Sequence, residues 1–211
     1  MNKTAEIVNR WAAFEAEHPK ASIHDFFRYE LIREREEQKN VKFLGGVIPP
    51  EPNQILPKIM DRITKISMVY ITDLLKSIDI GTFDEFLYLN NIQHLEKPRK
   101  IDVINNNFNE LSSGLLILER LKKKGLLTEN ADPNDKRSKL LALTPKGLKK
   151  LKACYELLGK VNQVIFRDMQ EDDILLCIQL LKPIETKFSS LTITDKKLSF
   201  DEVYKRELSG K

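Results

Sequence analysis

A charged, turn-rich run separates two short apolar segments, Leu126–Glu129 and Lys139–Leu143. The two segments have the length of β-strands, and the residues between them are typical of a turn. This pattern predicts a hairpin whose tip presents Arg137, with Asp132 setting the turn and Asp135 holding the loop in shape. Because a guanidinium group suits a narrow and negatively charged groove, we expect this tip to bind a polyanion.

Positive charge is concentrated in about a quarter of the chain. Residues 97–152 hold 14 Lys and Arg against 6 Asp and Glu, a net charge of +8, whereas the whole chain carries +4. The remainder is therefore acidic. Such an asymmetry favours a polyanionic partner, and a solvated lysine-rich surface is the alternative reading of the same count.

The helix expected from about Glu110 to Lys124 supplies a second group of candidate binding residues. Gly125 ends it, and Gly114 permits another helix to approach closely. Its apolar positions or their neighbours must face the core: Leu111, Leu115, Leu118 and Leu121. The outer face is then free to contact a binding partner, and Leu116 would add an apolar group to it. The candidates on or beside that face are Asn109, Ser112, Ser113, Leu116 and Arg120.

The short helix predicted near 100–106 adds basic residues at its start. Arg99 and Lys100 are placed to meet phosphate groups. Three asparagines at 105–107 could contact phosphate or could serve the turn for local backbone reasons. The lysines at 122–124 could add to this basic surface or could serve only to complement the C-terminal helix dipole.

Residues for catalysis or metal binding do not form a recognisable set. The three histidines are scattered and lack the spacing of metal ligands, and no phosphate-binding glycine loop or nucleophile motif occurs. Only Cys154 and Cys177 are present, which excludes a disulfide scaffold. A cysteine on an amphipathic helix is usually a small buried apolar residue, with oxidant sensing as the alternative. We expect no enzyme activity, cofactor or metal.

No stretch of the sequence reaches the roughly 18 consecutive apolar residues of a membrane span. The N-terminal residues also lack the apolar run of a signal peptide. With 41% apolar and 31% charged residues, the composition allows an ordinary core and a well-solvated surface. These observations predict a cytoplasmic protein without a membrane partner.

The first 57 residues are expected to form a helical arm and a linker. One helix carries Trp11 and Phe14 and ends at His18, and Ser22 caps a second helix with Phe26 and Phe27. Two glycines and four prolines in residues 41–57 predict that no helix survives there. We predict that this arm packs against C-terminal helices, across a dimer.

A new helix is expected to start near Lys58 and to end at Gly81. Its predicted apolar stripe consists of Ile59, Ile63, Ile66, Tyr70 and Leu74. Thr82 and Glu85 then form a capping-box pattern, which opens the next helix. That helix breaks at Lys97-Pro98.

Thr144 and Pro145 mark the start of a long helix after the hairpin, as N-cap and first helical residue. An apolar stripe with spacings of three and four continues for about six turns. A stripe of this length suits a partner helix and predicts a homodimer, and packing within one chain is the alternative. Its predicted contact residues are Leu148, Leu151, Tyr155, Leu158, Ile165 and Met169.

The order helix, helix, turn, helix and hairpin is the layout of a winged helix-turn-helix. The runs L-E-R-L-K-K-K-G-L-L-T-E (Leu118–Glu129) and D-P-N-D-K-R-S-K-L-L-A-L-T-P-K-G (Asp132–Gly147) resemble the MarR family of bacterial transcription regulators. The D-x-x-D-x-R pattern of the hairpin is the most specific part of the resemblance. The clear similarity covers about residues 83–158, and nothing before the proline-rich linker matches.

The resemblance implies a homodimeric repressor that binds palindromic double-stranded DNA. Its recognition helix would enter the major groove, where Asn109, Ser112 and Ser113 would contact base edges and Leu116 would touch a thymine methyl group. Arg137 on the wing would enter the minor groove. Lys136, Ser138 and Lys139 would contact phosphate groups. The resemblance also implies a pocket for a small effector between the dimerisation helices and the DNA-binding lobe.

The expected fold is therefore mainly α, with a small β-hairpin wing and with dimerisation helices on either side of the winged helix-turn-helix. The alternative function is a helical protein-interaction module whose winged helix does not bind DNA. The expected divisions are an arm and linker (1–57), a joining helix (58–81), the winged helix (82–144), dimerisation helices (145–190) and a charged tail (191–211).

Overall fold

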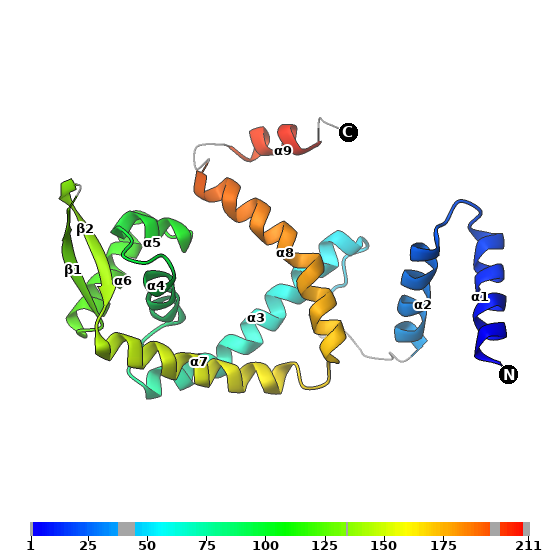
Figure 1. Cartoon of the computed structure of the whole chain (residues 1–211), viewed down its shortest axis with the longest axis horizontal. Coiled ribbons are helices and arrows are strands. Elements are labelled where there is room, and N and C mark those ends of the chain that lie inside the picture. The colour runs from blue at the N-terminus through cyan, green and yellow to red at the C-terminus, as the bar shows by residue number, and fades with distance from the viewer. Residues whose placement is uncertain (1, 38–44, 134, 195–198, 209–211) are drawn as a thin grey trace. The chain divides into compact units, whose positions relative to one another are not determined.

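The computed structural model describes residues 2–37, 45–133, 135–194 and 199–208, with side chains except at 34–37, 135–137 and 194. It contains helices and one two-stranded sheet (Figure 1). The elements in chain order are α1 (Lys3–Glu17), α2 (Ile23–Glu37), α3 (Pro52–Ser77), α4 (Phe83–His94), α5 (Lys100–Asn106), α6 (Leu111–Lys123), β1 (Leu127–Asp132), β2 (Asp135–Leu143), α7 (Pro145–Ile165), α8 (Glu171–Thr194) and α9 (Phe200–Leu208). The chain divides into two compact units, 1–58 and 59–211. Within the described residues, every helix is too short or too polar to cross a bilayer.

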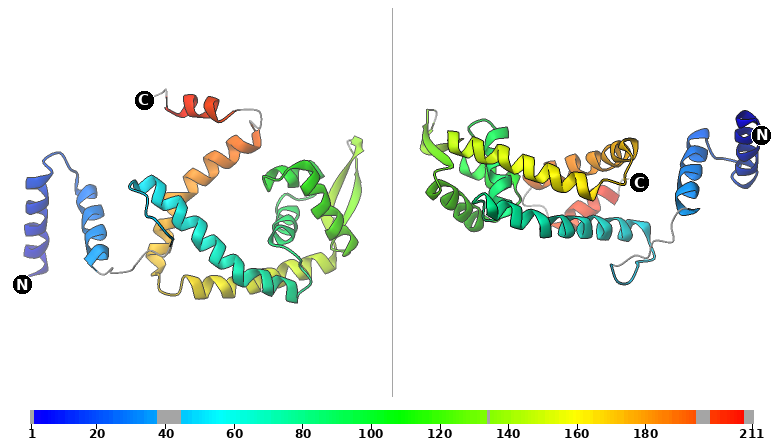
Figure 2. Two further views of the ribbon diagram at one scale, coloured as in Figure 1. Left: turned by 180° about the vertical axis from the view of Figure 1, so that it is seen from behind. Right: turned by 90° about the horizontal axis from the view of Figure 1, so that it is seen from below.

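Helices α1 and α2 lie side by side as a helical hairpin within the first unit (Figures 1 and 2). Phe14 and Phe26 are buried between them, with ring centroids 5.5 Å apart. Trp11 packs edge-on against Phe26 at 5.3 Å. The aromatic residues of this segment therefore form a small core of their own, although Phe27 remains exposed.

The predicted cap of α2 is confirmed. The Ser22 N–H and hydroxyl donate to the Asp25 carboxylate at 2.8 and 2.7 Å, and the Asp25 N–H donates back to Ser22 Oγ at 3.3 Å. This reciprocal arrangement satisfies donors that the first turn of a helix leaves free. The predicted end of α1 at His18 is confirmed as well.

The linker prediction is wrong for its last residues, because α3 begins at Pro52 and contains Pro57. Pro52 occupies the first turn, where a missing N–H costs no helical hydrogen bond. Pro57 removes one hydrogen bond, and the helix continues past it. The helix ends at Ser77, and Asp79 adopts a left-handed conformation with φ of 59°, so Gly81 is not the terminator.

The apolar stripe predicted along α3 does not face the core of its own chain. Ile71 and Leu75 are buried instead, and Leu74 packs partly against that core. The remaining stripe residues are exposed: Ile59, Ile63, Ile66 and Tyr70. The stripe is therefore an apolar surface of this chain.

Helices α4, α5 and α6 pack beside the hairpin (Figure 1), and the main hydrophobic core also contains residues of α3, α7 and the strands. Gly114 lies where α6 meets its neighbours, since a Cβ there would be 2.5 Å from Ile104 Cγ1 and 2.7 Å from Tyr88 Oη. The close approach predicted at Gly114 is confirmed. Along α6, Leu118 and Leu121 are buried as expected. Two further leucines predicted for the core are exposed, Leu111 and Leu115, and Gly114 and Ile117 take their place.

Strands β1 and β2 pair antiparallel, from Leu127 opposite Leu143 to Ala131 opposite Lys139. They are longer than predicted because polar residues continue the backbone ladder, which requires no apolar side chains. The hairpin is also tied to the loop before α5, because the Leu141 N–H donates to Pro98 O at 2.8 Å.

The start of α7 is as predicted. Thr144 Oγ1 accepts from the Gly147 N–H at 3.0 Å, and Pro145 is the first helical residue. Gly147 is required there, because a Cβ would lie 2.0 Å from the carbonyl oxygen of Leu126. The segment expected to be a charged tail after residue 190 is partly helical, since α8 extends to Thr194 and residues 200–208 form helix α9.

Candidate nucleic-acid interface

The outer face of α6 carries most of the residues predicted to read bases. Ser112, Ser113 and Leu116 are exposed, and Leu116 leaves 65% of its surface accessible. This face is free because the opposite side of α6 buries Gly114, Ile117, Leu118 and Leu121. The exposed side chains named here are two serines and a leucine. They could contact base edges and thymine methyl groups, but they add no positive charge.

Asn109 lies at the turn before α6 and is held by the core. Its Oδ1 accepts from the Tyr88 hydroxyl at 2.9 Å. Burial raises the pKa of Tyr88 to about 12, so the hydroxyl stays protonated and remains a donor at neutral pH. Because Oδ1 is occupied by this contact, the Nδ2 amide group of Asn109 is the candidate donor to a base.

Arg120 is anchored to α4. Its Nε lies 3.5 Å from Oε1 of Glu85, a carboxylate that is only 2% exposed. Lys124 Nζ and the Gly81 N–H donate to the other oxygen of Glu85 at 2.9 and 2.8 Å. The Glu85 carboxylate therefore connects the end of α6 to the start of α4, a link that its place in a capping-box pattern did not reveal.

The predicted capping box at Thr82 forms in part. Thr82 Oγ1 accepts from the Glu85 N–H at 3.2 Å, as predicted. The Glu85 side chain accepts from the Gly81 N–H rather than from that of Thr82, and the same oxygen accepts from Lys124 Nζ.

Arg99 and Asp132 join the start of α5 to the end of β1. Arg99 Nη2 and Nε lie 3.0 and 3.3 Å from Asp132 Oδ2. Asp132 is buried, whereas the Arg99 side chain is half exposed. The predicted bracing residue is thus in contact with a predicted phosphate-binding residue, and the exposed part of the guanidinium still faces solvent.

Three lysines surround Glu129 on β1. The Nζ atoms of Lys100, Lys122 and Lys139 lie 2.7, 3.1 and 3.3 Å from its carboxylate oxygens. The pKa of Glu129 is lowered to about 2, chiefly by the hydrogen bond from Lys100 and further by those from the other two lysines. Glu129 and Lys122 were absent from the predicted interface, because only the fold brings them beside Lys100 and Lys139.

The tip of the hairpin carries the remaining predicted residues. The side chains of Asp135, Lys136 and Arg137 lie outside the described residues. Ser138 is partly buried and Lys139 is exposed. The roles of these five residues stay predictions.

Two of the turn asparagines serve the fold. Asn106 Nδ2 donates to Asn91 Oδ1 at 3.0 Å, and Asn107 Nδ2 donates to Val103 O at 2.7 Å. These contacts favour the structural reading of the asparagine run over phosphate binding.

The residues predicted for dimerisation divide into two groups. Leu151 belongs to the core of its own chain, and Leu158 and Ile165 pack partly against that core. Placing Leu151 in a contact with another chain was wrong, because that side of α7 faces α4 and β2. Leu148, Tyr155 and Met169 are exposed, and Met169 lies beyond the end of α7.

Tyr155 also contacts its own lobe. Its hydroxyl donates to Asn90 Oδ1, and its ring meets Phe86 edge-on with centroids 5.7 Å apart. The side chain therefore helps to orient α7 against α4 while half of its surface remains accessible.

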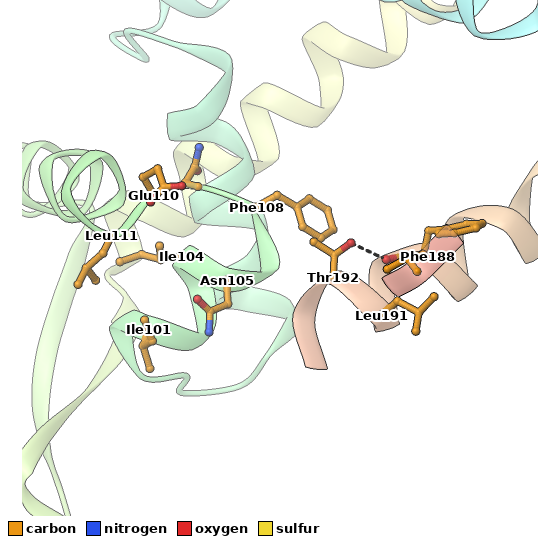
Figure 3. Close-up of a pocket in the computed structure, with 11 residues that line it drawn as sticks. Ile101, Ile104, Asn105, Phe108, Glu110, Leu111, Phe188, Leu191 and Thr192 are labelled. Atoms are coloured by element: carbon orange, nitrogen blue, oxygen red, sulfur yellow. Dashed lines mark hydrogen bonds between the residues drawn. The ribbon is translucent and has the colours of Figure 1, made fainter. Parts of the chain in front are cut away.

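A cavity of about 530 Å³ opens between the α5–α6 turn and the C-terminal helices. Figure 3 shows Phe108 pointing toward Thr192 and Phe188 of α8. The walls are mainly apolar, and Asn105, Asn109, Glu110 and Thr192 supply polar groups. A cavity with this lining suits a small aromatic or apolar molecule with a polar substituent.

The two cysteines differ in environment. Cys154 is buried in the core and Cys177 is exposed on α8. Burial raises the pKa of Cys154 to about 11, so its reactive thiolate form is scarce at neutral pH. This environment favours the reading of Cys154 as an apolar core residue.

Comparison with known proteins identifies the lobe around α6. Residues 82–147 match the family described as winged helix DNA-binding domain. No curated protein sequence matches the chain.

Solved structures match over more of the chain. A variant of MarR from E. coli, determined in complex with operator DNA, has a TM-score of 0.55 and 24% identity, covering 63% of this chain and 96% of its own. BpsR from Bordetella bronchiseptica has a TM-score of 0.54 and 19% identity, covering 62% and 98%. PcaV from Streptomyces coelicolor has a TM-score of 0.50 and 20% identity, covering 63% and 96%. The predicted winged helix fold, with the helical layout of MarR proteins, is confirmed.

Proposed function

We propose that this protein is a homodimeric transcriptional regulator of the MarR type, which represses genes by binding palindromic DNA and responds to a small ligand. The observation that carries this proposal is the winged helix DNA-binding domain at residues 82–147, whose helix α6 has an exposed outer face. The positive charge concentrated in residues 97–152 supports a polyanionic partner.

In the proposed complex, α6 lies in the major groove and the hairpin reaches the adjacent minor groove. A helix about 10–12 Å wide fits the major groove, where the four base pairs present different donors and acceptors. Ser112, Ser113 and the Asn109 amide donate to base edges, and Leu116 contacts a thymine methyl group. Arg137 enters the minor groove, and nearby basic residues contact phosphate groups.

Dimer formation is supported by the exposed apolar surface of α8. Four residues at a spacing of four lie along one side of this helix and are exposed: Leu176, Leu180, Ile184 and Phe188. None of the side chains described on α8 is fully buried. Because a helix this apolar requires a covering surface, a second copy of the chain is the proposed partner.

A two-fold dimer would present two copies of α6 to the DNA. Half-sites would then be separated by about one helical turn, roughly 34–36 Å. The prediction that residues 1–57 pack against the C-terminal helices of the second copy stays part of this proposal. Deleting that segment should lower dimer stability, and an unchanged dimer would contradict it.

A ligand response is supported by the cavity beside Phe108. One wall belongs to the turn that leads into α6, so a ligand bound there could alter how α6 and the wing meet DNA. BpsR, which shares the fold, is a protein whose DNA binding is regulated by 6-hydroxynicotinic acid. Small aromatic acids are therefore the first compounds to test.

Selection of bound fragments from genomic DNA tests this function. We expect the enriched fragments to share an inverted repeat with half-sites about one helical turn apart. Enrichment without any shared repeat would contradict sequence-specific binding by a symmetric dimer. Titration of aromatic acids into the selected complex then tests the ligand response.

A further inference from the structure

The cluster around Glu129 combines residues from four elements. Lys100 comes from the start of α5, Lys122 from the end of α6, and Lys139 from β2, while Glu129 lies on β1. All three ammonium groups are within 3.3 Å of its carboxylate oxygens. The carboxylate is 7% exposed, whereas the lysine side chains are 33–61% exposed. One nearly buried negative charge therefore holds three positive charges at the surface.

The electrostatics of the cluster depend on the carboxylate. Three ammonium groups so close together would repel one another and separate if Glu129 were neutral. With Glu129 ionised, the cluster keeps a net charge of +2 in a fixed position. Glu129 is ionised near neutral pH, since its pKa lies below the ordinary value of 4.5 for a glutamate.

Each lysine retains hydrogen-bonding capacity. An ammonium group has three N–H donors, and the contact with Glu129 uses one. The three lysine side chains are partly exposed, so their remaining donors are accessible to a ligand. A phosphate group is a suitable acceptor for such a convergent set of donors.

We propose that Glu129 is a positioning residue of the DNA interface, which holds Lys100, Lys122 and Lys139 as one phosphate-binding cluster and fixes the wing against α5 and α6. This inference rests on the proposed DNA-binding function and adds Lys122 and Glu129 to the interface. Its consequence is unusual for a carboxylate, because removing a negative charge close to DNA should weaken binding.

The variant Glu129→Gln separates positioning from net charge. It removes the negative charge while preserving the size of the side chain. If net charge alone governed binding, the variant would bind duplex DNA more tightly, since a repulsive charge is lost. If Glu129 positions the lysines, we expect affinity to fall by roughly five- to tenfold.

Glu119→Gln is the matched control. Glu119 lies exposed on α6 and the substitution makes the same change in net charge. We expect this control to bind as tightly as the wild type or more tightly. Glu129→Asp keeps the charge on a shorter side chain and should bind more tightly than Glu129→Gln. If Glu129 acted only by filling space, the shorter aspartate would not restore affinity.

Fluorescence anisotropy with a selected genomic duplex measures the affinities of the wild type and the three variants, at a temperature where circular dichroism shows each protein folded. Equal or tighter binding by Glu129→Gln relative to the wild type would overturn the inference while leaving the proposed function intact. Absence of binding by the wild type would instead reject the proposed function and, with it, this role of Glu129.

Discussion

The Arg99 guanidinium donates to the Asp132 carboxylate although the two residues are 33 positions apart, with Nη2 3.0 Å from Oδ2. Asp132 ends β1 just before the tip of the hairpin, and Arg99 precedes the first residue of α5. The ion pair therefore fixes the outer part of the wing to the helix-turn-helix. The wing is held by this contact near its tip and by the Glu129 cluster further along β1.

Asp132→Asn should loosen the wing. The substitution removes the charge from a buried acceptor of two hydrogen bonds, so we expect the free energy of unfolding to fall by about 1–2 kcal/mol. Amide exchange in β1 and β2 should accelerate. Urea denaturation and hydrogen exchange measure the two effects, with Asp168→Asn, an exposed position, as the control. Equal unfolding free energies for both variants would show that the ion pair does not stabilise the wing.

Two glycine positions give opposite predictions for the same substitution. Gly114→Ala places a Cβ 2.5 Å from Ile104 Cγ1, so we expect destabilisation by about 1–3 kcal/mol from overpacking. Gly159 lies on α7, and a Cβ added there would have no atom within 4 Å. Gly159→Ala should therefore stabilise the protein by about 0.5–1 kcal/mol, because alanine favours the helix more than glycine does. Thermal unfolding of both variants checks the pair. A neutral Gly114→Ala would mean that α6 does not pack as closely on α5 as described.

The Glu129 cluster predicts a defined loss of stability in acid. The lysines lower the pKa of Glu129 from 4.5 to about 2 in the folded protein. Because the folded value is the lower one, the stabilisation is fully present above about pH 4.5 and is lost as the pH falls toward 2.

Comparison with Glu129→Gln isolates that contribution. We expect the difference in melting temperature between wild type and variant to be constant from pH 7 to about pH 5 and then to shrink with acidification. Differential scanning calorimetry across this range provides the measurement. A difference that stayed constant down to pH 3 would contradict the ion pairing of Glu129.

The exposed stripe of α8 predicts the effect of a single charge on assembly. Leu180 is 60% exposed at the centre of the stripe. Leu180→Glu would bury a carboxylate in the proposed interface, so the dimer should dissociate into folded monomers. Gln179→Glu, an adjacent exposed position, should remain dimeric. Analytical ultracentrifugation distinguishes these states, and a dimer that survives Leu180→Glu would place the interface elsewhere.

Local signals in the sequence predicted the elements well. Ser22, Gly125 and Thr144-Pro145 mark helix boundaries through hydrogen bonds and backbone conformations within a few residues, and the structure confirms each of them. Two boundary signals were wrong, because α3 ends at Ser77 rather than at Gly81 and continues past Pro57. One missing hydrogen bond did not outweigh the rest of a 26-residue helix.

Contacts between distant residues were not predictable in the same way. Glu85 and Glu129 each bind basic residues from other elements, and their charge alone does not reveal these partners. The apolar stripe of α7 was likewise ambiguous. Leu148 and Leu151 are three residues apart and both belong to the stripe, but Leu151 faces the core and Leu148 faces solvent. The fold decides which side of such a helix is covered.

Salt-dependent binding of duplex DNA tests the central claim most directly. For the wild type and a selected genomic duplex, we predict that the logarithm of affinity falls linearly with the logarithm of salt concentration, as phosphate contacts release counterions. Arg137→Ala should bind more weakly, with a slope reduced by about one, and should remain folded and dimeric. Absence of duplex binding by the wild type even at low salt would contradict the account.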